Sequence, residues 1–209
     1  GYEVEKVTAA TALGNTVSLS KERDGRYAFT MPTAEVTVTV RFKKAETPKT
    51  VDFDDVPTQA YYFEAVKWAV EKNITGGTGS GLFSPDSPCT RAQIVTFLWR
   101  AAGSPSPQMG INPFTDVSES AYYYQAVLWA VENGITGGTT ASTFSPNATC
   151  TRSQGVTFLH RSKGTPAAGQ ATFSDVPASA YYAAAVSWAA DRGVTGGTGN
   201  GRFSPGNHC

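Results

Sequence analysis

The stretch FDDVPTQAYYFEAVKWAVEKNITGGTGSGLFSPDSPC, residues 53–89, decides the fold because the chain repeats it twice. Related stretches begin 61 residues later, at Phe114, and a further 59 residues later, at Phe173. The Phe-x-Asp-Val opening, the Tyr-Tyr pair, the Trp-Ala pair, the Thr-Gly-Gly run and the Phe-Ser-Pro run coincide in all three copies. Such self-similarity indicates a repeat protein made from copies of one supersecondary unit.

Each copy predicts a helix followed by a glycine-rich loop. Apolar residues in the first copy have the i, i+3, i+4 spacing of one helical stripe: Tyr62, Ala65, Val66, Ala69 and Val70. A residue that tolerates the left-handed conformation ends each stripe: Asn73, Gly134 and Gly193. We expect a tryptophan beside each stripe to pack in the core: Trp68, Trp129 and Trp188. We expect the loop phenylalanines to hold the loops against the core: Phe83, Phe144 and Phe203.

A second helix is predicted in the first two copies. Threonine at the N-cap and glutamine three residues later predict a capping box worth about 1 kcal/mol; these pairs are Thr90 with Gln93 and Thr151 with Gln154. The residues predicted to form its apolar face are Ile94, Val95, Phe97, Leu98 and Ala101. The third copy ends at Cys209, without the Thr-Arg pair and without a second helix.

Arg91 and Arg152 follow the N-caps directly, where a cation is disfavoured by about 0.3–1 kcal/mol because backbone N–H groups already carry partial positive charge. Each arginine is either a solvated side chain lying across the loop or, with the helix N-terminus, a site for a carboxylate or phosphate. The neighbouring Gly-Gly loop would let such a ligand approach the backbone closely. Since neither arginine is needed for the cap, we expect their replacement by alanine to leave the fold intact.

These motifs together resemble the S-layer homology repeat of bacterial surface proteins, over about residues 51–209. The resemblance implies three helix-loop-helix repeats, at 52–103, 113–163 and 172–209, in a pseudo-threefold assembly whose third repeat is truncated. It also implies non-covalent attachment to secondary cell-wall polymers, often through a pyruvylated sugar whose carboxylate is anionic. The family motif usually ends in Glu, whereas Gln93 and Gln154 stand here and keep the capping without the charge.

The resemblance and the anion-site hypothesis together give a set of candidate ligand-binding residues. By the resemblance, Arg91 and Arg152 are polymer-binding candidates, with the preceding Thr90 and Thr151 beside them. The Gly-Gly pairs are expected to border the groove: Gly76 and Gly77, Gly137 and Gly138, and Gly196 and Gly197. The aspartates of the Phe-x-Asp-Val openings are weaker candidates: Asp55, Asp116 and Asp175. For these aspartates, capping of a helix start or a turn is the alternative role.

The N-terminal region, residues 1–43, predicts a small antiparallel β domain instead. Alternation of Val36, Val38, Val40 and Phe42 with polar residues predicts a strand with one buried face. Asp24-Gly25 between strand-like runs predicts a hairpin. The region resembles an incomplete copy of the small β-repeats that serve as stalks on secreted Gram-positive proteins, and residues 44–51 read as a linker. The expected fold class is therefore α+β and multidomain.

Composition and side-chain chemistry exclude several functions. Seventeen basic and seventeen acidic residues cancel, which argues against general binding of nucleic acid or anionic membrane. Cys89, Cys150 and Cys209 with His208 would suit zinc, but their spacing follows the repeat and no Cys-x-x-Cys occurs, so no metal is predicted. With two histidines in the chain, a nucleophile–histidine catalytic group has little support, so neither a cofactor nor an enzymatic activity is predicted.

The sequence thus favours a non-catalytic module that anchors a larger extracellular protein to the cell wall or S-layer. Its predicted partner is an anionic secondary cell-wall polymer attached to peptidoglycan. The alternative is structural: an assembly module that joins other surface-layer chains and completes its third repeat in trans.

Overall fold

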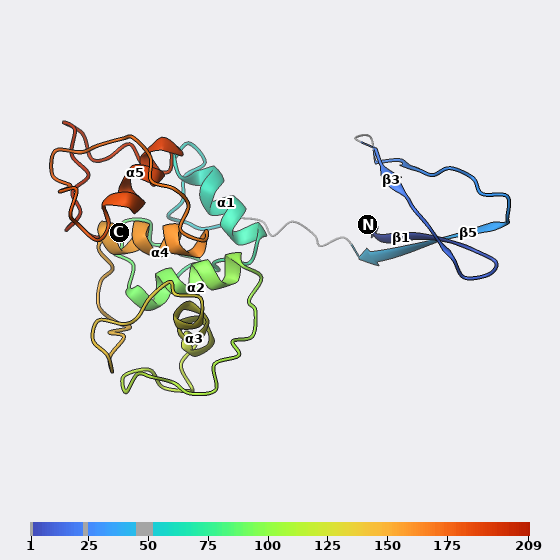
Figure 1. The fold of residues 1–209 in the computed structure, drawn as a ribbon. Coiled ribbons are helices and arrows are strands. Elements are labelled where there is room, and N and C mark those ends of the chain that lie inside the picture. The colour runs from blue at the N-terminus through green and yellow to red at the C-terminus, as the bar shows by residue number, and fades with distance from the viewer. Residues whose placement is uncertain (1, 23–24, 45–51) are drawn as a thin grey trace. The chain divides into compact units, whose positions relative to one another are not determined.

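The computed structural model describes residues 2–22, 25–44 and 52–209 (Figure 1). The chain divides into two compact units, residues 1–49 and residues 50–209. Antiparallel strands form the first unit and five helices lie in the second, so the architecture is α+β. Residues 45–51 of the predicted linker lie outside the described residues.

The first unit contains two small sheets. Its strands are β1 (Tyr2–Thr11), β2 (Thr16–Val17), β3 (Ser20–Lys21), β4 (Tyr27–Ala28) and β5 (Val36–Lys44). One sheet has the order β2-β1-β5 and the other pairs β3 with β4, with every pairing antiparallel. The β3–β4 pair confirms the predicted hairpin: Gly25 has a φ of 87° and donates from its N–H to the Glu22 carbonyl at 3.0 Å, while Asp24 lies outside the described residues.

The prediction that strand 36–42 has one buried face is wrong. In β5, Val38, Val40 and Phe42 are 46%, 41% and 61% exposed, and within the described part of this unit Ala9 is the one buried hydrophobic residue. The alternation is real, but the narrow three-stranded sheet has no second layer to cover it among the residues described.

The helices are α1 (Phe63–Glu71), α2 (Arg91–Ala101), α3 (Tyr124–Glu132), α4 (Arg152–Ser162) and α5 (Ala183–Asp191). α1 and α2 with their connecting loop form the first repeat, α3 and α4 the second, and α5 belongs to the third. The predicted order of helix, loop and helix is therefore confirmed in the first two repeats.

Local sequence signals end and begin these helices as predicted. Asn73, Gly134 and Gly193 have φ values of 57°, 66° and 68°, the left-handed conformation. The following residue then donates back into the last helical turn, as from Ile74 N–H to the Ala69 carbonyl at 2.8 Å. Both capping boxes are formed at the starts of α2 and α4.

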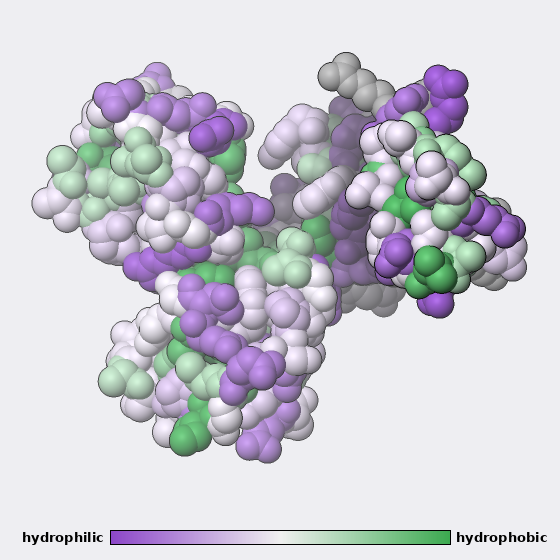
Figure 2. Space-filling view, turned by 45° about the vertical axis from the view of Figure 1, so that its right-hand side comes forward, coloured by the Kyte–Doolittle hydropathy of each residue, from purple (hydrophilic) through white to green (hydrophobic). Residues whose placement is uncertain are grey.

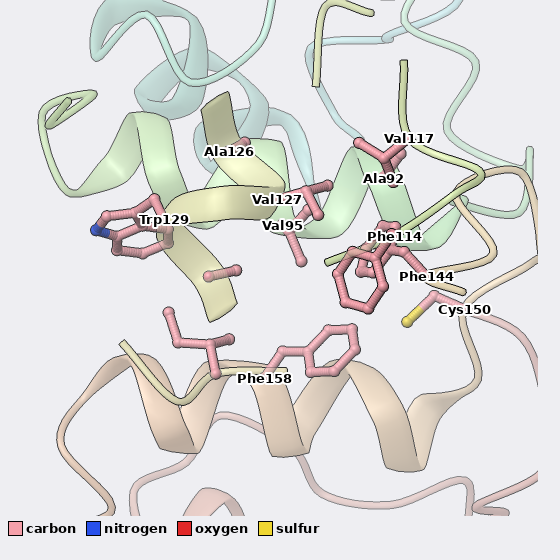
Figure 3. Close-up of a cluster of buried hydrophobic side chains, with 12 residues drawn as sticks. Ala92, Val95, Phe114, Val117, Ala126, Val127, Trp129, Phe144, Cys150 and Phe158 are labelled. Carbon is pink, nitrogen blue, oxygen red and sulfur yellow. The ribbon is translucent and has the colours of Figure 1, made fainter. Parts of the chain in front are cut away.

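Helix pairs build the core of the second unit. α2 packs on α3, α4 packs on α5, and α2 lies beside α4 (Figure 1). Figure 3 shows the largest cluster, in which Val95 of α2, Val127 of α3 and Phe158 of α4 converge on Phe114 and Phe144. This cluster joins two repeats, while a smaller cluster of Val56, Val66 and Val70 lies within the first repeat. The predicted role of the loop phenylalanines is confirmed, since Phe144 and Phe203 are 0% and 2% exposed and Phe83 packs on a third cluster.

Two predictions about buried faces need correction. Trp129 and Trp188 are buried, but Trp68 is 53% exposed. In the described chain no helix packs against α1 as closely as α2 packs against α3 or α4 against α5. In α2 the buried residues are Arg91, Ala92, Val95 and Thr96, whereas Ala101 is exposed. This face turns toward the next repeat, which a single copy of the motif cannot indicate.

The repeats are interleaved through backbone hydrogen bonds. The first two N–H groups of α2, on Arg91 and Ala92, donate to the carbonyls of Ala148 and Pro146 in the second repeat, at 2.9 and 3.0 Å. The corresponding donors of α4 reach Asn207 and Pro205 in the third repeat, at 2.8 and 3.1 Å. N–H groups that a helix start leaves free are therefore satisfied by the repeat that follows.

Figure 2 shows that hydrophilic and hydrophobic residues are interspersed over the visible face of the molecule. Among the described residues, no helix combines the length and the apolar character needed to cross a bilayer.

Candidate ligand-binding groove

Arg91 is buried, which excludes the solvated interpretation of this side chain. It is 3% exposed, its Nε donates to the Phe144 carbonyl at 2.9 Å, and its guanidinium lies 4.9 Å from the Phe144 ring and 5.3 Å from the Phe158 ring. The hydrogen bond and the ring contacts hold the loop of the second repeat. These contacts argue against the expectation that Arg91 can be removed without affecting the fold.

The Nη2 atom of the same guanidinium has no hydrogen-bond partner although it is buried. Burial also lowers the pKa of Arg91, but an arginine still carries its charge at neutral pH. An unpartnered N–H donor on a buried cation is costly unless a ligand accepts from it. The Nη2 donor of this guanidinium is thus left without an acceptor.

That side chain lines a groove of about 290 Å³ between the repeats. Its walls include the loop residues Gly137 and Gly138, Arg161 in the last turn of α4, and Tyr181 of the third repeat. Arg161 donates from Nη1 to the Ile135 carbonyl at 3.2 Å. Two arginines and no carboxylate line this groove, so it favours an anion.

The two glycines of the groove, Gly137 and Gly138, differ in whether the surrounding structure leaves room for a side chain. Gly138 has a φ of 92°, and a Cβ there would lie 2.6 Å from the Phe114 ring, so a side chain is excluded. A Cβ on Gly137 would meet nothing within 4 Å, so no packing in the chain requires a glycine there. The open space over Gly137 is available to a ligand.

Arg152 repeats this arrangement toward the third repeat. Its Nε donates to the Phe203 carbonyl at 2.9 Å, its guanidinium lies 4.7 Å from the Phe203 ring, and its Nη2 reaches Thr195 Oγ1 at 3.4 Å. Arg152 therefore belongs with the Gly196–Gly197 loop, which follows Thr195. Each arginine thus donates a hydrogen bond to the loop of the repeat that follows its own.

A second groove, of about 390 Å³, borders Gly76 and Gly77 of the first repeat. Arg100 and Tyr122 line it, at the positions that Arg161 and Tyr181 occupy in the other groove. In the described chain no arginine takes the place that Arg91 takes beside Gly138. This groove is therefore less equipped to hold an anion.

The three aspartates hold the loops. Asp116 accepts from the N–H groups of Phe144 and Ser145 with its two carboxylate oxygens, both at 2.8 Å. Asp55 and Asp175 make the same pairs of bonds to the loops of their own repeats, and the bonds from Phe83 and Phe203 lower the pKa of the respective carboxyl groups. With both oxygens engaged, the capping alternative describes these residues better than ligand binding does.

Thr90 and Thr151 also have structural partners. Their hydroxyl oxygens accept from the backbone N–H groups of Gln93 and Gln154, at 3.2 and 3.3 Å. Sequence reasoning missed the four residues that complete the grooves: Arg100, Arg161, Tyr122 and Tyr181. Their recurrence at matching positions was the available signal. Among the described residues, no group of three or more His, Cys, Asp or Glu side chains is arranged to hold a metal ion.

The fold is that of a repeat module with an arginine-lined groove between adjacent copies. The sequence model of the S-layer homology domain matches residues 52–95, 113–154 and 172–209. The chain therefore belongs to the S-layer homology family.

Three relatives illustrate where such repeats occur. The chain is 31% identical over 142 residues to a surface-layer 125 kDa protein of Lysinibacillus sphaericus, which is 68% of this chain and 12% of that protein. It is 28% identical over 142 residues to a cellulosome-anchoring protein of Acetivibrio thermocellus, 64% of this chain and 31% of that protein. It is 34% identical over 102 residues to an endoglucanase of Bacillus sp. (strain KSM-635), 49% of this chain and 10% of that protein.

The chain thus spans less than a third of the length of each of these relatives. The family and the relatives indicate cell-wall anchoring and an extracellular location at the cell wall and surface layer. Anchoring is a binding role, so nothing in the matched region implies catalysis.

Proposed function

We propose that residues 52–209 tether a larger extracellular protein to the bacterial cell wall by binding an anionic secondary cell-wall polysaccharide. The observation that carries this proposal is the buried, unpartnered Nη2 of Arg91 at a groove without carboxylates. In this proposal residues 1–43 are a stalk-like unit, 44–51 a linker and the repeats the binding part.

The ligand group that best suits the groove is a carboxylate on a sugar, as in a pyruvylated residue. A carboxylate can accept from Arg91 Nη2 and from the second guanidinium, that of Arg161, in charge-assisted hydrogen bonds. The sugar ring would then lie over Gly137, beside the aromatic ring of Tyr181. A volume near 290 Å³ is at the small end of ligand pockets, which suits a terminal sugar better than a long stretch of polymer.

We also propose that the three repeats are related by pseudo-threefold symmetry. Three features support it: the equivalent contacts of Arg91 and Arg152, the equivalent loop bonds of the three aspartates, and the closed ring of backbone hydrogen bonds described below. Arg152 with Gly196–Gly197 would then border a further groove of the same type.

Co-sedimentation with purified cell walls tests the anchoring function. We expect the chain to sediment with untreated walls and to stay in solution after the acidic polymer has been extracted. Arg161→Gln should weaken binding at least tenfold, because one of the two groove cations is lost. Arg192→Gln removes the same charge from the exposed end of α5, outside the groove, and should bind normally.

Thermal melts of both variants show whether the fold survives. Unchanged binding to extracted walls, or equal binding by two folded variants, would overturn the proposal.

The second candidate is the assembly module, which a specific observation favours. Trp68 and Val194 are 53% and 51% exposed, whereas their equivalents are buried: Trp129 and Trp188, on helices that α2 and α4 pack against, and Ile74 and Ile135, in repeats that have a second helix. A helix like α2 or α4, supplied by another surface-layer chain, would cover both residues and complete the third repeat in trans. Light scattering discriminates between the candidates: a chain that binds walls yet stays monomeric at all concentrations removes the second one.

A further inference from the structure

Three chain segments meet in a closed ring at the cysteines. Cys150 N–H donates to the Cys89 carbonyl at 2.8 Å, Cys209 N–H donates to the Cys150 carbonyl at 3.0 Å, and Cys89 N–H donates to the Cys209 carbonyl at 2.8 Å. Each cysteine thus contacts the backbone of the other two, although successive cysteines stand 61 and 59 residues apart in the sequence. All three are free thiols in the structure.

The ring brings the Cα atoms within reach of a disulfide. The path from Cys150 Cα through its carbonyl and the 3.0 Å hydrogen bond to Cys209 Cα spans at most about 7 Å, by standard bond lengths. The bonds along this path are bent, so the actual separation is shorter. Disulfides require Cα atoms roughly 4.4–6.8 Å apart. The backbone alone makes all three pairings feasible.

The side chains select one pairing. The Cys150 and Cys209 side chains influence each other: the Cys209 thiol raises the pKa of Cys150, and the Cys150 thiol lowers the pKa of Cys209 to about 7. Gly155 makes room for this contact, because a Cβ there would lie 2.9 Å from the Cys209 sulfur and 4.0 Å from the Cys150 sulfur. In the first repeat the equivalent position is Ile94. The Cys209 sulfur therefore lies where a side chain at residue 155 would be.

We propose that Cys150 and Cys209 form a disulfide between the second and third repeats in the presence of an oxidised low-molecular-weight thiol, while Cys89 stays reduced. The Cys209 thiolate attacks one sulfur of the small disulfide and releases one small thiolate. The Cys150 thiol loses its proton to solvent, and its sulfur attacks the Cys209 sulfur and displaces the second small thiolate. Two electrons thus pass to the small disulfide, which becomes two thiols, and one S–S bond forms in the protein.

The bond would fasten the loop that Arg152 holds. Residues 203–209 supply the carbonyls that accept from Arg152 and from the first turn of α4. Closing a loop of about 60 residues constrains the unfolded chain, and we expect the melting temperature to rise by roughly 5–15 °C. The inference uses the extracellular location of the family and is independent of the glycan, so loss of wall binding would not affect it.

Oxidised glutathione is the probe, applied to the full chain at pH 8. We expect titratable thiols to fall from three to one, without dimer formation, and peptide mapping to join Cys150 to Cys209. Cys89→Ser should still lose two thiols. Gly155→Ile, which fills the space beside the sulfurs, should keep all three thiols under the same treatment.

Mapping on the unmodified chain decides the result even if a variant folds poorly. Three remaining thiols, a bond that includes Cys89, a bond between two chains, or a stable adduct with glutathione would each overturn the proposal.

Discussion

The guanidinium of Arg91 uses different nitrogens for different purposes. Its Nε donates to the carbonyl of Phe144 in the next repeat, whereas its Nη2 is buried without a hydrogen-bond partner. A helix N-terminus disfavours a cation in its first turn. The contacts with the following repeat offset that cost, and they explain why arginine stands there in both repeats that have a second helix.

Replacing these arginines should therefore destabilise the protein as well as weaken binding. We expect Arg91→Ala to lower the free energy of unfolding by about 2–3 kcal/mol, from the lost charged hydrogen bond and ring contacts. Arg152→Ala should cost less, because this side chain is only half-buried. Urea unfolding followed by tryptophan fluorescence measures both, since every tryptophan lies in residues 52–209.

Arg91→Lys is the matched control, because it keeps the charge but loses the planar fork. We expect it to recover little of the lost stability. Full recovery by lysine would show that charge alone explains the arginine, contrary to the contacts seen.

The loop aspartates predict an acid dependence of stability. Backbone hydrogen bonds, the bond from Phe203 first, keep the pKa of Asp175 below its ordinary value. A carboxyl group with a lowered pKa in the folded state contributes stability above its unfolded pKa, near 4, and loses that contribution as the pH falls through the folded value. Asp55 follows the same rule.

Asp175→Asn should accordingly melt at a lower temperature at pH 7 and lose less on acidification below about pH 4. Thermal melts of both proteins between pH 7 and pH 2.5 test this. Parallel curves for the two proteins would contradict the assigned role.

The importance of the arginines was predictable from the sequence, but their partners were not. A cation in a disfavoured position is a local anomaly, visible in one line of sequence. Its acceptor lies 53 residues away for Arg91 and 51 for Arg152, a separation that local patterns do not encode. Arg161 and Tyr181 were missed for the same reason, since their groove forms only when three repeats meet.

At the scale of the loop element, the two glycines of each Gly-Gly pair should respond differently to a methyl group. Gly138→Ala should cost more than about 1 kcal/mol, because its φ of 92° and the Phe114 ring both exclude a side chain. Gly137→Ala should leave the melting temperature unchanged, because its Cβ would meet open space. The added methyl should nevertheless reduce wall binding by narrowing the groove.

Sedimentation with cell walls and thermal melts of both variants separate these effects. Normal binding by Gly137→Ala would remove this loop from the proposed site.

Helix boundaries were predictable because their determinants are local. The Thr90–Gln93 box and the left-handed Asn73 act within one turn of the helix that they start or end. Buried faces were less predictable: the face of α2 turns toward another repeat, so Ala92 and Thr96 are buried while Ala101 is exposed. For β5, alternation predicted a strand correctly, but covering its apolar side requires a second layer that a strand cannot supply.

At the scale of the whole molecule, three equivalent tryptophans lie in different surroundings. Trp129→Phe should lower the free energy of unfolding by about 1–3 kcal/mol, because it leaves a cavity in the core. Trp68→Phe should stay within about 0.5 kcal/mol, because half of that side chain is in water. Urea titrations of the two variants at several protein concentrations test this.

If Trp68→Phe lost as much stability as Trp129→Phe, and if its loss increased with protein concentration, another chain would have to cover Trp68. That result would favour the assembly function.

The number and order of the repeats were evident from the sequence, yet the way in which they interlock was not. Internal repetition shows that a unit recurs, but it does not show which unit supplies each unit's missing contacts. Here the backbone donors at the start of α2 and α4 are satisfied by the following repeat.

Because of this interleaving, the unit that is repeated in the sequence, a single repeat, is smaller than the unit that folds, which includes the repeat that follows it. A polypeptide of residues 52–103 alone would leave the Arg91 and Ala92 N–H groups and the Arg91 Nε to water, and would lack the phenylalanine rings that cover its guanidinium. Recombination can therefore move these repeats between surface proteins as a set, whereas a transplanted single copy would lack the neighbouring residues that bury its Arg91.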